Sequence, residues 1–153
     1  MDKEKSLSEL NALIEINNDR IEGYDSAIKE TDETDLKNMF TQFMQTSQKC
    51  KQELVSEVQK LGGKPEEGTK TTGKLYRLFM DLKSAMTGKD REAILNSCEY
   101  GEDVAVDTYK DCMKDNSECF TPEQQSMLKK QYEMIKADHD KVRSMRDASK
   151  GKD

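Results

Sequence analysis

Apolar residues recur every three or four positions over four long stretches of the chain, which is the spacing of one face of an α-helix. The first stripe is made of Leu7, Leu10, Ile14, Asn17, Ile21, Tyr24 and Ile28, and the second of Leu36, Phe40, Phe43, Ser47, Cys50, Leu54, Val58 and Leu61. A shorter stripe is made of Leu75, Phe79, Leu82 and Met86. The pattern predicts an all-α protein with long helices over 5–30, 36–61, 91–113 and 121–148 and a short helix over 74–86.

The breaks between these stretches predict how the helices are connected. "TDETD" (31–35) is a short polar break, whereas "GGKPEEGTKTTG" (62–73) begins with a glycine suited to a left-handed helix end and continues into a loop. "TPEQ" (121–124) has the form of a capping box with proline in the first helical turn. Two short links and one long link with its own short helix predict a ferritin-like four-helix bundle with one long crossover. We expect residues 1–148 to form one domain and residues 149–153 a flexible tail.

The composition of the chain limits the partners and the cellular location that we expect. The 153 residues are 33% hydrophobic and 37% charged, as expected for amphipathic helices that share one interior, and the net charge is −6. This charge argues against nucleic acid or an anionic membrane as a partner. No stretch has the length of a membrane span or the apolar centre of a signal peptide, so we expect a cytoplasmic protein. The four cysteines lack the spacing of zinc ligands or of a redox pair, and we expect them to be reduced packing residues.

Two glutamates interrupt an otherwise apolar stripe in the third long helix. That stripe is made of Leu95, Glu99, Glu102, Val106, Tyr109 and Met113. A carboxylate in such a setting needs a partner, because burying an unpaired charge is costly. Glu99 and Glu102 are therefore the best candidates for a functional site.

Two interpretations of these glutamates remain open. In the first they are metal ligands together with His139, the only histidine, with Asp25 or Asp138 as a further ligand; iron, manganese or zinc would then be the ion. The Glu-x-x-His pair of di-iron bundles is absent, since Lys136 stands three positions before His139. In the second they form a buried polar layer and need no cofactor. They would pair with Arg20, Arg143 or Arg146 at the edge of the bundle, or form hydrogen bonds with Tyr24 or Tyr109.

Four stretches together resemble a known family. They are "LNALIEINNDRIEGYDSAI" (10–28), "VQKLGGKPEEGTKTTGKLYR" (58–77), "EYGEDVAVDTY" (99–109) and "HDKVRSMRDA" (139–148). In this order they are similar to a bacterial family of uncharacterised four-helix-bundle proteins, a domain of unknown function in the ferritin-like superfamily. The resemblance implies a ferritin-like bundle and a cytoplasmic or stress-associated setting, and it implies no activity.

Two hypotheses about function follow. The first is a non-catalytic bundle with a structural, interaction or stress-associated role. The apolar side of its short helix, made of Tyr76, Phe79 and Met80, would either cover the bundle or meet a second subunit in a homodimer. The second is a metal-binding bundle with a degenerate ferritin-like site on Glu99, Glu102 and His139. Enzymes of other kinds are disfavoured, because the chain has neither a phosphate-binding glycine loop nor a nucleophile motif.

Overall fold

The computed structural model describes residues 3–68, 91–115 and 117–150. Within these ranges the long helices are α1 (Lys3–Glu30), α2 (Thr34–Lys60), α4 (Arg91–Asp115) and α5 (Pro122–Lys150), and a 3₁₀ turn, η1 (Ser117–Cys119), precedes α5. The all-α prediction is confirmed, and each end of a long helix lies within two residues of the predicted one. None of these helices is both long enough and apolar enough to pass through a lipid bilayer. The short helix predicted over 74–86 lies outside the described residues, so the homodimer through its apolar side stays a prediction.

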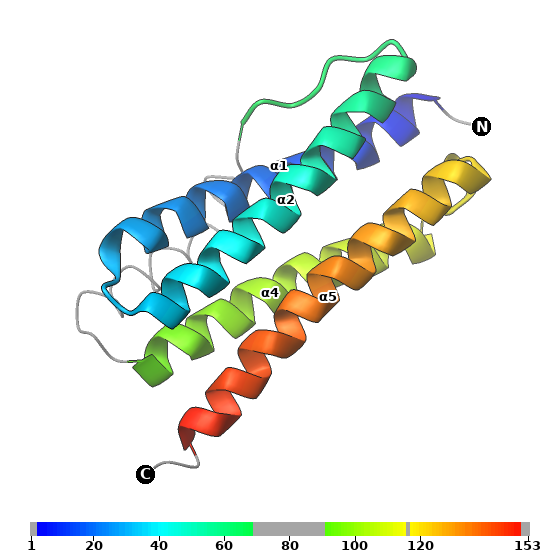
Figure 1. Cartoon of the computed structure of the whole chain (residues 1–153). Helices are drawn as coiled ribbons and strands as arrows, with labels where there is room; N and C mark the ends of the chain where they lie inside the picture. Colours follow the sequence, from blue (N-terminus) through cyan, green and yellow to red (C-terminus); the bar gives the residue numbers. More distant parts are fainter. Residues whose placement is uncertain (1–2, 69–90, 116, 151–153) are drawn as a thin grey trace.

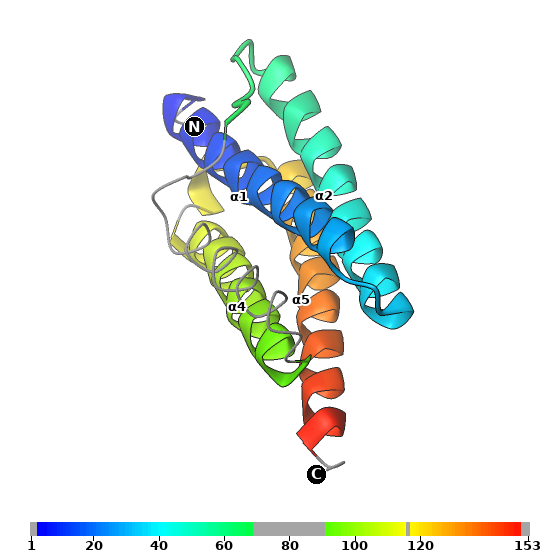
Figure 2. The ribbon, with the colours of Figure 1, turned by 90° about the vertical axis from the view of Figure 1, so that its left-hand side faces the viewer.

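The four long helices form two antiparallel hairpins, α1 with α2 and α4 with α5, that pack against each other (Figures 1 and 2). Helix α1 lies beside α4, and α2 lies beside α5. Helices α2 and α4 run in the same direction, so the end of α2 and the start of α4 lie at opposite ends of the bundle (Figure 1). Arg91, at the start of α4, binds Asp35 at the start of α2 through Nη2 to Oδ2 (2.5 Å) and Nη1 to Oδ1 (3.3 Å). This exposed ion pair links the starts of the two parallel helices at one end of the bundle.

Helix α2 ends at the predicted glycine. Gly62 has a φ of +80°, its N–H donates to the Gln59 carbonyl (2.9 Å), and the N–H of Gly63 donates to the Val58 carbonyl (3.0 Å). These bonds form a Schellman motif, which satisfies carbonyls that the helix end would leave unpaired.

Replacing Gly62 with alanine should lower the free energy of unfolding by about 1–2 kcal/mol, because a Cβ is disfavoured at positive φ. The new methyl group would meet only the Lys3 ammonium, at 3.7 Å, so the cost is one of backbone conformation. Urea denaturation of Gly62→Ala beside Gly68→Ala, whose backbone is not left-handed, measures it. Equal stability of the two variants would contradict the assignment.

Helix α5 begins with the predicted capping box. The N–H of Gln124 donates to the Thr121 hydroxyl (3.1 Å), and the N–H of Thr121 donates to Oε1 of Gln124 (3.0 Å). Each side chain therefore satisfies a backbone donor of the other residue, and Pro122 occupies the first helical position.

Among the described residues, the core consists of two apolar clusters along the bundle. The cluster nearer the start of α1 is made of Leu10, Leu13, Ile14, Ile16, Cys50, Leu54, Val58, Ala105, Val106, Tyr109, Cys112, Phe120, Leu128 and Ile135. The other is made of Tyr24, Ala27, Leu36, Met39, Phe40, Phe43, Ile94, Leu95, Cys98 and Val142. On every helix the two sets are separated by buried polar residues, among them Arg20, Ser47, Glu102 and Asp138. A polar layer thus divides the core in the middle of the bundle.

Candidate functional site

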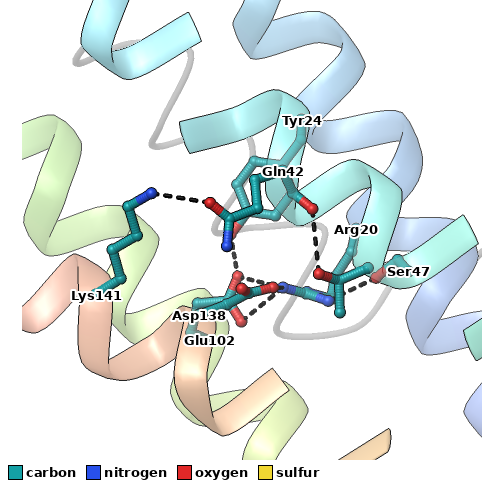
Figure 3. Close-up of polar contacts among 8 residues, drawn as sticks. Arg20, Tyr24, Gln42, Ser47, Glu102, Asp138 and Lys141 are labelled. Atoms are coloured by element: carbon teal, nitrogen blue, oxygen red, sulfur yellow. Dashed lines mark hydrogen bonds and ion pairs between the residues drawn. The ribbon is translucent and has the colours of Figure 1, made fainter. Parts of the chain in front are cut away.

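The centre of this layer is the guanidinium group of Arg20. Its Nη2 donates to both carboxylate oxygens of Glu102 (2.8 and 3.0 Å) and approaches Oδ2 of Asp138 at 3.2 Å. Its Nη1 donates to the hydroxyl of Ser47 at 2.6 Å. The side chains come from α1, α2, α4 and α5 and point toward one another (Figure 3). The Arg20 layer, meaning Arg20, Ser47, Glu102 and Asp138, therefore joins all four long helices.

Tyr24 completes the surroundings of Glu102. Its hydroxyl donates to Oε1 of Glu102, one helical turn from Arg20. The ring of Tyr24 lies 5.7 Å from the guanidinium carbon and stacks on Phe40 with ring centroids 5.6 Å apart. The Glu102 carboxylate, which is fully buried, is thus bound by one cation and one hydroxyl. This bonding offsets the cost of removing the charge from water.

The Arg20 layer holds one cation and two carboxyl groups, and the pKa values of Arg20, Asp138 and the neighbouring Tyr24 are shifted. Burial favours loss of the proton from Arg20, but the adjacent Glu102 and Asp138 outweigh it, and the pKa of Arg20 lies above its ordinary value. Burial raises the pKa of Asp138 to about 6, although Arg20 partly opposes the shift. Burial and the Glu102 carboxylate raise the pKa of Tyr24, which keeps its hydroxyl a donor. We conclude that Arg20 is charged at neutral pH and that Asp138 gains or loses a proton near pH 6.

A second buried polar layer lies beside the first. Nδ2 of Asn17 donates to the Tyr109 hydroxyl (2.9 Å), which in turn donates to Oε1 of Gln131 (2.8 Å). Nε2 of Gln131 donates to the Cys50 carbonyl (3.4 Å) and to Oε1 of Glu53 (3.1 Å). This chain of bonds also touches all four long helices. Because buried polar groups need matched partners, two such layers favour one register of the helices.

Glu99 and His139 belong to a different group, between α4 and α5. Glu99 forms an ion pair with Arg146, as the sequence suggested. Nε2 of His139 lies 2.5 Å from Oδ1 of Asp103, and Nδ1 lies 3.3 Å from Oδ1 of Asp140. Ligand atoms of Glu99, Asp103 and His139 lie within 4.8 Å of one another, an arrangement that could hold a metal ion.

The structure therefore divides the three residues predicted as metal ligands. Glu99 and His139 lie together, and Asp103 stands where Glu102 was expected. Glu102 instead binds Arg20 inside the bundle. Of the two suggested further ligands, Asp138 also binds Arg20, whereas Asp25 forms an exposed ion pair with Lys29.

Arg20 itself is not at the edge of the bundle, where the sequence interpretation placed it; its side chain is only 1% exposed. The regular apolar stripe passes through Ile21, which is half-buried, and not through Arg20. A signal was present, since Arg20 lies seven residues from both Leu13 and Ala27, which are buried. The charge of Arg20 favours a position at the surface, because an arginine is seldom fully buried without a partner.

The four cysteines are free and buried, as expected for packing residues. Burial raises the pKa of the Cys50 and Cys112 thiols to about 12. A thiol with such a pKa is protonated at neutral pH and is a poor nucleophile. These cysteines are therefore not candidates for a reactive site.

A family model described as "Domain of unknown function (DUF2383)" matches residues 5–115. The matched range contains nearly all of α1 and the whole of α2 and α4, and thus Arg20, Ser47 and Glu102. Asp138 and His139, on α5, lie beyond it. No curated protein matches the chain.

Proposed function

Because the chain belongs to the DUF2383 family, whose function is unknown, we propose a function from its geometry: a non-catalytic, ferritin-like bundle with a structural or interaction role. The parallel course of α2 and α4, with one long connection between them, supports the ferritin-like assignment (Figure 1). A bacterial, stress-associated setting belongs to the same proposal and rests on the resemblance described above.

The binding of the core carboxylates supports the non-catalytic role. In di-metal bundles, carboxylates from facing helices converge in the core and bind the metals. Here Glu102 and Asp138 converge on the guanidinium of Arg20, which lies 2.8 and 3.2 Å from their oxygens. The arginine supplies the positive charge that a metal would supply and has no redox chemistry. A metal site on Glu99, Glu102 and His139 together remains the alternative, and it would require Glu102 to leave Arg20 and Tyr24.

An iron-oxidation assay separates these two roles. With Fe²⁺ and oxygen, we expect the protein to leave the rate of iron oxidation at that of the buffer, and Glu102→Gln to behave in the same way. Acceleration by the wild-type protein that Glu102→Gln abolishes would contradict the proposal. Asp103→Asn serves as the control, because it alters the group between α4 and α5 and leaves the Arg20 layer intact.

A further inference from the structure

We propose that Glu99, Asp103 and His139 form a binding site for a divalent transition-metal ion, open to solvent, between α4 and α5. This site does not include Glu102 and does not depend on the role proposed for the centre of the bundle. It differs from the trio predicted from the sequence by Asp103, whose side chain is 53% exposed.

The positions of the three residues suit a shared ligand. Glu99 and Asp103 are four residues apart on α4 and therefore lie on one face of the helix. His139 reaches the same point from α5, so two helices that already pack together hold all three side chains. Two atoms bound to one zinc ion at about 2.0–2.2 Å are at most roughly 4.4 Å apart. Since the ligand atoms here lie within 4.8 Å of one another, small side-chain rotations suffice.

The surroundings of the His139 ring also indicate a cation. Each ring nitrogen faces a carboxylate oxygen, Nε2 that of Asp103 and Nδ1 that of Asp140. An imidazolium donates to both of them, whereas a neutral imidazole has one N–H, donates to only one and presents a lone pair at its other nitrogen. If Nδ1–H donates to Asp140, the lone pair of Nε2 and the Asp103 oxygen are ready to bind a metal together. A metal-bound histidine usually donates its other ring N–H to a carboxylate, and Asp140 has the position of that carboxylate.

The charges around the group favour a divalent ion. Glu99, Asp103 and Asp140 bring three carboxylates, and two cations lie on them: Arg146, which binds Glu99 and Asp147, and Lys136, which binds Asp140. Arg146 contacts Oε2 of Glu99. One imidazole with two carboxylates is a donor set for zinc, manganese or ferrous iron. The exposure of Asp103 leaves room for water as a further ligand.

Calorimetric titration of the full chain with Zn²⁺ tests the site. We expect one ion per chain, loss of this binding in His139→Gln and in Asp103→Asn, and affinity about 10–100-fold weaker in Asp140→Asn. Asp107→Asn, an exposed position one turn further along α4, is the matched control and should bind as the wild type does.

Three results would overturn the proposal. The first is a wild-type protein that binds no stoichiometric zinc, and the second is a His139→Gln variant with unchanged affinity, which would make the histidine only an ion-pair partner. The third is loss of binding in Glu102→Gln but not in Asp103→Asn, which would move the metal to the centre of the bundle. Circular dichroism of each variant shows that the helices are intact.

Discussion

Replacing Arg20 with methionine should lower the free energy of unfolding by about 3–5 kcal/mol at pH 7.5, because it leaves buried carboxylates without their cation. Methionine keeps much of the apolar stem of the side chain, so the loss reports mainly on charge. Glu102, fully buried, would retain only the Tyr24 hydroxyl, and Asp138 would face it without the guanidinium between them. Urea denaturation followed by circular dichroism measures the change.

Two further variants serve as comparisons for the stability loss of Arg20→Met. Arg91→Met removes another arginine that binds two carboxylates, those of Glu33 and Asp35, but that side chain is 34% exposed. Its loss should cost about 1 kcal/mol or less. The triple variant Arg20→Met/Glu102→Leu/Asp138→Leu should recover most of the lost stability, since apolar groups can replace a whole buried ion pair. An Arg20→Met protein as stable as Arg91→Met would show that the guanidinium is not buried among the carboxylates.

The second large effect concerns pH. The pKa of Asp138 is about 6 in the folded protein, raised by burial from its ordinary value near 4. Between pH 4 and pH 6 the carboxyl group of Asp138 is protonated in the folded state and ionised in the unfolded state. Its contribution to the free energy of unfolding is therefore full at low pH and falls as the pH rises toward 6. Asp138→Asn removes the titration. As the pH rises from 4 to 7, the free energy of unfolding of the variant should therefore increase by on the order of 2–3 kcal/mol relative to that of the wild type.

Urea denaturation of both proteins across this range provides the measurement. Asp140→Asn is a control of opposite sign, because the contact with His139 lowers the pKa of Asp140 and its contribution is lost as pH falls. If the difference between wild type and Asp138→Asn stayed constant from pH 4 to pH 7, Asp138 would not be the desolvated group described here.

The helices and their ends could be predicted because local rules determine them. The left-handed glycine at Gly62 and the capping box at Thr121 and Gln124 depend on a few neighbouring residues, and both are found as predicted. Asn17 and Ser47 were also placed correctly in the interior, since they interrupt regular apolar stripes.

The site was only partly predictable, because it depends on the rotation of each helix in the bundle. Glu99 and Glu102 share one stripe, yet Glu102 is fully buried while the Glu99 side chain is 13% exposed. Asp138 and His139 are consecutive and point about 100° apart around α5, so one joins the Arg20 layer and the other reaches Asp103. The spacing of Arg20 from Leu13 and Ala27 points to the interior, but its carboxylate partners come from two helices distant in sequence, and no local pattern identifies them.

A guanidinium group, not a metal, joins the carboxylates at the middle of the bundle. Anomalous diffraction at the zinc edge from crystals grown with Zn²⁺ tests it most directly. We predict density for the Arg20 guanidinium between Glu102 and Asp138, with no zinc peak there and with any ordered zinc beside His139 and Asp103. A zinc peak bound by Glu102, with Arg20 turned away from it, would contradict the account.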